Sequence, residues 1–115
     1  VYNLNVLSQN AALAALEYAD DILAHNIPPT LAARDVFYKA LEAVPEITAY
    51  PSATNFVLIR VPDGPAMDKA LRDADISVRS YKADNLKDCL RITITTEDVV
   101  QKVVAVLTKE VKKHA

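Results

Sequence analysis

The sequence predicts an α+β domain in which helices pack on one face of a small, mostly antiparallel sheet. Apolar residues recur at helical spacing in the first third and at the end of the chain, whereas short segments between residues 47 and 95 alternate apolar and polar side chains, as strands do. Hydrophobic residues make up 51% of the 115 residues, which is enough for the core of one domain. We therefore predict a single domain over 1–115 with the order α-α-β-β-α-β-β-α, divided into a linker helix region (1–29) and an α+β core (30–115).

The first third of the chain predicts two helices with a break between them. Ser8 is a suitable N-cap for a helix that runs toward His25. Pro28 and Pro29 should interrupt this helix, because proline removes a backbone donor and restricts the residue before it. Thr30 can then cap a second helix that ends before residue 45.

Residues 11–16 make the first helix apolar nearly all round. This pattern is typical of a helix buried between domains. Exposed apolar surface of this kind favours association. We therefore expect self-association, or exchange of the helix between copies.

The middle of the chain predicts two strands and a third helix. Residues 47–50 form a short candidate strand, and residues 54–61 form a stronger one. A turn follows, and Pro65 stands near the first position of a helix, where proline is favoured. Asp75 stands at the end of that helix, where a left-handed residue is expected, and aspartate tolerates this conformation.

The last part predicts two more strands and a final helix. The strands lie around residues 76–81 and 89–95, and Thr96 is the expected cap of the helix that follows them. One face of the later strand is apolar, and the other carries Cys89, Arg91, Thr93 and Thr95.

Two arginines on the polar face of these strands form the strongest candidate site. Arg91 lies midway along the later strand and Arg79 holds the equivalent place in the earlier one. Two guanidinium groups on one sheet face would present paired donors to a phosphate or a carboxylate. The alternative is that both are ordinary solvent-facing arginines.

Composition excludes several other classes of function. The net charge of −2 and the aromatic content of 6% argue against a nucleic-acid partner. No apolar run is long enough for a membrane span, and no signal peptide is visible. The lone Cys89, expected as a small core or half-buried residue, fits a reducing compartment, so we expect a cytoplasmic protein.

The residue types needed for catalysis are missing or scattered. Gly64 is the one glycine, so neither a P-loop nor a dinucleotide fingerprint can form. His25 and His114 have no neighbours at metal-ligand spacing. The serines lack a nucleophile elbow, and every lysine lies on a polar helix face, a helix end or a charged loop. We expect no catalytic residue, no metal and no bound cofactor in this chain.

Four ordered segments resemble histidinol-phosphate aminotransferases. They are Tyr2-Asn3-Leu4-Asn5 with Ser8-Gln9, then Tyr50-Pro51-Ser52-Ala53-Thr54-Asn55-Phe56, then Val78-Arg79, then Cys89-Leu90-Arg91-Ile92-Thr93. Related fold-type I enzymes, including threonine-phosphate decarboxylases, share parts of this pattern. The resemblance covers essentially the whole chain.

The resemblance implies the C-terminal small domain of a pyridoxal-phosphate-dependent transaminase of histidine biosynthesis, a family of dimers. It implies that Arg91 and Arg79 bind the anionic end of a small substrate, and that Asn55 lies nearer the site entrance. The implied partners are the missing N-terminal cofactor-binding domain and a second copy.

This chain departs from the family's pattern in several places. Val1 replaces a usual proline, Pro28-Pro29 fall where the family continues its first long helix, and Thr95 and Asp75 stand where glycine is common. The Schiff-base lysine of the family lies N-terminal to the region that the chain resembles. Without it, pyridoxal phosphate has no anchoring aldimine, so we expect the isolated chain to be inactive. The alternative is a free-standing α+β module for ligand binding or assembly.

Overall fold

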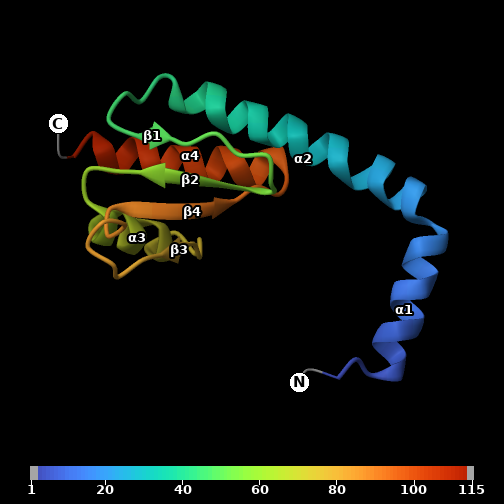
Figure 1. Cartoon of the computed structure of the whole chain (residues 1–115). Helices are drawn as coiled ribbons and strands as arrows, with labels where there is room; N and C mark the ends of the chain where they lie inside the picture. The colour runs from blue at the N-terminus through green and yellow to red at the C-terminus, as the bar shows by residue number, and fades with distance from the viewer. Residues whose placement is uncertain (1–2, 114–115) are drawn as a thin grey trace.

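The computed structural model describes residues 3–113, so Val1, Tyr2 and His114 lie outside the described residues. The element order is the predicted one: α1 (Val6–Glu17), α2 (Ala19–Leu41), β1 (Thr48–Ala49), β2 (Phe56–Arg60), α3 (Gly64–Asp73), β3 (Arg79–Ser80), β4 (Cys89–Thr93) and α4 (Glu97–Val111). Figure 1 shows these elements along the chain.

The four strands form one antiparallel sheet in the order β1-β2-β4-β3. The central pair is β2 and β4, in which Leu58 lies opposite Arg91 and Ile59 opposite Leu90. The outer strands are short, with two residues each. The long alternating segments of β2 and β4 therefore form the centre of the sheet.

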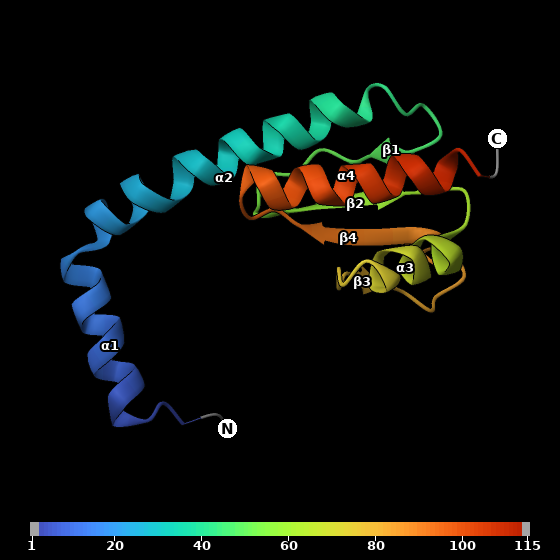
Figure 2. The same cartoon turned by 180° about the vertical axis from the view of Figure 1, so that it is seen from behind.

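Helices α2, α3 and α4 cover one face of the sheet, as the two opposite views in Figures 1 and 2 show. The core lies between that face and the helices. Its apolar residues, in chain order, are Ala33, Phe37, Leu41, Val44, Ile47, Val57, Ile59, Val61, Met67, Leu71, Leu90, Ile92, Ile94, Val100, Val103, Leu107 and Val111. The predicted α+β class, with helices on one face, is confirmed.

The predicted N-terminal helix boundaries were wrong. Asn5, not Ser8, caps α1, and its Oδ1 accepts a hydrogen bond from the Ser8 backbone N at 2.8 Å. The helices divide at Tyr18, and α2 continues through Pro28 and Pro29.

The fixed φ of proline is compatible with a helix, so the cost of the proline pair is the lost donors and the ring clash. Side chains on either side bind backbone carbonyls. Asn26 Nδ2 donates to Ile22 O at 2.7 Å, and Thr30 Oγ1 donates to Asn26 O at 3.0 Å. They reach the carbonyls of Ile22 and Asn26 and so flank the pair, whereas the i−4 carbonyls that lose a donor to the prolines are those of Ala24 and His25.

Helix α1 and the first half of α2 project away from the sheet as an arm (Figure 1). No residue of α1 is buried. Leu7 is 81% exposed and Leu16 is 71% exposed. Further exposed apolar residues of the arm are Leu4, Val6, Leu13, Tyr18, Ile22, Leu23, Ile27 and Leu31. This surface is far more apolar than a solvated helix requires.

Gly64 fixes how α3 meets the segment that leads into β4. A Cβ at this position would lie 2.1 Å from Lys87 O and 2.7 Å from Asp88 Cα. The Gly64 backbone N donates to Asp88 Oδ1 at 3.2 Å, while Asp63 caps the helix. The glycine is therefore needed for close packing beside β4.

The residues at two helix ends, Asp75 after α3 and Thr96 before α4, were predicted correctly, but the hydrogen bonding of Thr96 was not. Asp75 adopts the left-handed conformation at the end of α3, with φ 59°. Thr96 takes the N-cap position of α4, but its hydroxyl donates to the Asp98 carboxylate and makes no cap bond to the backbone. Among residues 3–113, no helix is long and apolar enough to cross a membrane.

Candidate functional site

Arg79 and Arg91 lie directly opposite each other on β3 and β4. Residues at such paired positions point to the same side of a sheet, with Cβ atoms roughly 5 Å apart. Both arginines are exposed. Arg91 lies on the sheet face away from the core, because its chain neighbours Leu90 and Ile92 point into the core, and Arg79 shares that face through its pairing with Arg91. The structure therefore brings together the two arginines that the sequence singled out.

No carboxylate pairs with either arginine within the described part of the chain. Asp88, the nearest acid in sequence to Arg91, accepts the Gly64 backbone N instead. Arg91 Cζ lies 4.9 Å from the centroid of the Phe56 ring, a cation–π contact that restrains the guanidinium without neutralising it. Phe56 was not predicted as part of the site. It lies diagonally across from Arg91, two residues from the directly opposite Leu58, and this placement depends on the strand register.

A third arginine lies on the same face. Arg60 ends β2 opposite Cys89, and its Nε donates to the Tyr50 hydroxyl at 3.2 Å. Its Nη2 donates to Asn85 O, also at 3.2 Å. The hydrogen bond to Tyr50, more than any other interaction, raises the pKa of Arg60 above its usual value. Because both bonds join segments distant in sequence, no local motif could have indicated this cluster.

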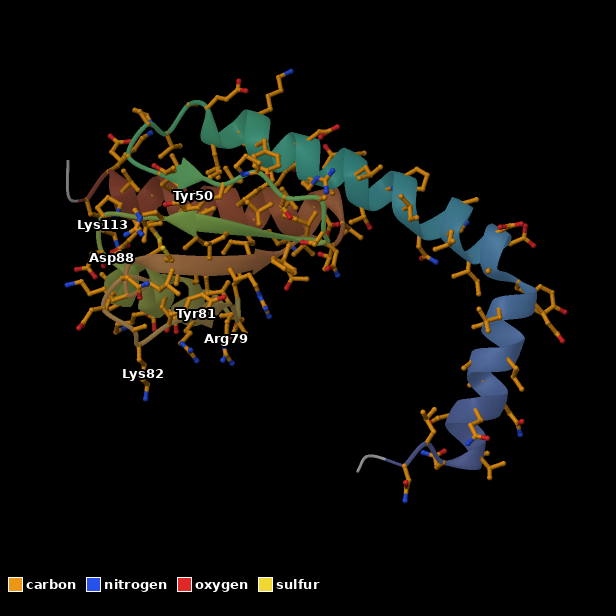
Figure 3. All side chains as sticks on the ribbon, in the orientation of Figure 1. Tyr50, Arg79, Tyr81, Lys82, Asp88 and Lys113 are labelled. Atoms are coloured by element: carbon orange, nitrogen blue, oxygen red, sulfur yellow. The ribbon has the colours of Figure 1, made fainter. Side chains whose placement is uncertain are left out.

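Asn55 and Cys89 lie outside the exposed arginine pair. Asn55 precedes β2, and its backbone carbonyl accepts Ile94 N at 2.7 Å, beyond the strand positions that face the arginines. Cys89 lies on the arginine side of β4 by alternation and is fully buried, which agrees with its expected place as a core or half-buried residue. Figure 3 shows Arg79 and Tyr81 at the β3 edge of the sheet and Tyr50 on the β1 side.

The residues present do not fit pyridoxal phosphate. Lys69 pairs with Asp73 at 2.6 Å with both side chains exposed, and this hydrogen bond raises the pKa of Lys69. Lys113 pairs with Glu110. Gly64, the one glycine, packs closely against Lys87 O, so it is not part of a glycine-rich phosphate loop. No lysine is held in a buried site where an aldimine could form.

A groove of about 440 Å³ lies between α3 and α4, on the helix side of the molecule. Its lining includes Ala66 and Ala70 and the paired lysines Lys69 and Lys113. None of its lining residues belongs to the arginine face. Residues 3–113 also contain no group of three or more histidine, cysteine or acidic side chains able to hold a metal.

The sequence is similar to that of histidinol-phosphate aminotransferases, although no family model matches the chain. Histidinol-phosphate aminotransferase from Chromobacterium violaceum is 35% identical over 99 residues, which cover 84% of this chain and 28% of the relative.

Solved structures give the same result. An unconfirmed aminotransferase from Burkholderia pseudomallei superposes with a TM-score of 0.81 at 30% identity, covering 93% of this chain and 33% of that one. Histidinol-phosphate aminotransferase from Sinorhizobium meliloti, solved with pyridoxal-5′-phosphate, gives a TM-score of 0.68 at 23% identity. This match covers 91% of the present chain and 28% of that enzyme. At that identity the second match supports the fold alone. The chain is homologous over most of its length to histidinol-phosphate aminotransferases, and it spans about 30% of the full-length enzymes.

Proposed function

We propose that this chain is the small domain of a pyridoxal-phosphate-dependent aminotransferase and that it contributes recognition of the substrate's anionic end. The observation that carries the proposal is the pairing of Arg79 with Arg91 on the open sheet face, without an acidic partner among the described residues. Paired guanidinium groups favour a phosphate or carboxylate, which accepts bidentate charge-assisted hydrogen bonds. In the intact enzyme the amino group would pass between glutamate or 2-oxoglutarate and a phosphorylated or carboxylated substrate.

The chemistry itself would reside in the missing part of the enzyme. The chain spans 28% of the relative from Chromobacterium violaceum, and none of its lysines lies in a cofactor cradle. Pyridoxal phosphate and an amino donor added to this chain should therefore give no turnover. The exposed apolar arm, with Leu7 and Leu16 among its residues, provides a surface on which the missing cofactor-binding domain would pack.

Titration with inorganic phosphate and a phosphate monoester, followed by the backbone amide signals of β3 and β4, tests anion recognition. We expect the signals of Arg79 and Arg91 to shift together. Substitution of either arginine by alanine should weaken binding by about tenfold or more, because each removes charge-assisted hydrogen bonds. Arg72→Ala, which removes an exposed arginine paired with Asp68 on α3, is the matched control. Equal affinity in all variants would sink the proposal.

A free-standing binding or assembly module is the second candidate. It is favoured by the core, which residues of this chain alone close between the sheet and the helices. The two candidates differ in what an added cofactor-binding domain does. If the arm is an interdomain surface, that domain should protect the amides of α1 from hydrogen exchange, whereas a free-standing module should show no change.

A further inference from the structure

The loop between β3 and β4 is held at its base and at its tip by different bonds: Asp88, at the base, accepts Val61 N and Gly64 N, and Asn85, at the tip, accepts the Arg60 side chain. Residues 81–88 join the two arginine-bearing strands, and the loop tip is closed by Leu86 N, which donates to Ala83 O at 2.9 Å. Within residues 3–113, the hydrogen bond from Arg60 Nη2 to Asn85 O is the one that joins this tip to another part of the fold.

Strand β3 depends on this loop because it is short and lies at the sheet edge. It has two residues, and two register pairs connect it to β4. Edge strands of this length contribute little independent stability. The position of Arg79 therefore depends on the loop that follows it as well as on Ile76 and Val78, which pack against the core before it.

The accessibility of the Cys89 thiol can be used to measure whether the loop is closed. Its place in β4 puts it on the open face opposite Arg60, yet none of its surface is exposed. The loop turns back at this point, where Cys89 N donates to Leu86 O at 2.8 Å. Arg60, opposite in the register, and the loop end at Leu86 are thus the groups that the strand pairing and the backbone bond place beside Cys89.

We propose that Arg60 is a positioning residue that holds the β3–β4 loop over Cys89 and thereby keeps Arg79 beside Arg91. The guanidinium suits this task because its planar fork reaches two acceptors at once, the Tyr50 hydroxyl and Asn85 O. The link to Arg79 rests on the proposed anion site, whereas the loop contact itself does not.

The test is the rate at which a disulfide reagent such as dithionitrobenzoate modifies Cys89, the one cysteine of the chain. In this reaction the Cys89 thiolate attacks the reagent disulfide, a mixed disulfide forms, and the aromatic thiolate leaves. Arg60→Met keeps a side chain of similar length over the thiol but removes both hydrogen bonds. We expect modification to become about tenfold faster or more, because the loop opens without global unfolding.

If Arg60 acted on Cys89 only through its charge, Arg60→Met would slow the modification of Cys89 instead of speeding it. Removing a cation beside a thiol disfavours the reactive thiolate, so a faster reaction in Arg60→Met must come from access. Arg72→Met, an exposed arginine on α3, should leave the rate unchanged. Tyr50→Phe removes one of the two Arg60 bonds and should give an intermediate rate; it also serves as the test if Arg60→Met fails to fold.

A thiol rate in Arg60→Met equal to that of the parent, or a rise explained entirely by a lower global unfolding free energy, would overturn the proposal. Phosphate titration of the same variants separates the two proposals. Faster thiol modification with weaker phosphate binding supports both. If Arg60→Met is modified faster but the unaltered chain binds no phosphate, the role of Arg60 in the loop is supported and the anion site is refuted.

Discussion

Arg79 and Arg91 lie directly opposite each other in the β3–β4 pair, with Leu58 opposite Arg91 on its other side. Like charges at opposed positions destabilise a sheet. No carboxylate among residues 3–113 offsets this repulsion. The protein thus keeps an unfavourable charge pair on a face that no helix covers, and a bound anion would relieve it.

Removing one of these charges should stabilise the fold and weaken anion binding. Arg79→Thr should raise the free energy of unfolding by about 0.2–1 kcal/mol, because it ends the repulsion and introduces a residue with high strand propensity. The same variant should bind phosphate more weakly. Urea unfolding and phosphate titration measure the two effects.

Arg79→Lys is the matched control for the charge. It keeps the repulsion, so its stability should equal that of the parent, but it loses the bidentate fork. The gain in Arg79→Thr should shrink in high salt, which screens exposed charges. A gain that is independent of salt would mean that strand propensity, not charge, causes it.

Filling the space at Gly64 should disrupt the junction between α3 and β4. The added Cβ of Gly64→Ala would lie 2.1 Å from Lys87 O, a backbone atom that cannot move without shifting Asp88. We expect a loss of about 1–3 kcal/mol in unfolding free energy, the usual range for overpacking. Ala105→Met, on the exposed side of α4, is the control and should have little effect. Parent-like stability of Gly64→Ala would show that this junction is not tightly packed.

The sequence predicted most of the fold because its periodicities are strong. The alternation in β2 and β4 placed Arg91 on the polar face and Leu90 in the core, as the structure shows. Alternation fixes the face of a residue but not its register, so the direct opposition of Arg79 and Arg91 could not be predicted.

Two failures have local physical causes. Pro28 and Pro29 were expected to break a helix, but the helix boundary is at Tyr18, and nearby polar side chains bind carbonyls around the proline pair. Arg60 lies in the strand predicted over 54–61, but it was not predicted as part of a site. Its acceptors Tyr50 and Asn85 lie 10 and 25 residues away, so only the folded chain brings them to it.

The apolar arm should cause self-association of the isolated chain. Leu7 and Leu16 of α1 are largely exposed, and water-exposed apolar surface of this extent favours burial against another copy. The double variant Leu7→Lys/Leu16→Lys should shift the sedimentation profile toward the 12.6 kDa monomer. Its unfolding free energy should change by less than about 0.5 kcal/mol, because neither side chain contributes to the core.

Gln9→Lys adds a positive charge to the same helix at a polar position and should not alter association. A parent chain that sediments only as a monomer at high concentration would contradict the expectation. So would an association that persists unchanged in the double variant.

The start of α4 should give a measurable dependence of stability on pH. The Thr96 hydroxyl, the largest influence, lowers the pKa of Asp98, which lies in the first turn of the helix. A carboxyl whose pKa is lower in the folded state stabilises the fold above its unfolded value of about 3.9, and this contribution is lost as pH falls through the folded value.

Thr96→Val removes the donor and keeps the shape. We expect the pKa of Asp98 to rise toward its ordinary value, as measured by carboxylate NMR titration, with a loss of stability at neutral pH that disappears at pH values below the folded pKa. In an Asp98→Asn background the carboxylate is absent, so Thr96→Val should no longer change the pH dependence. If the loss of stability in Thr96→Val is the same at neutral and acidic pH, its cause is the N-cap position of Thr96 and not its bond to Asp98.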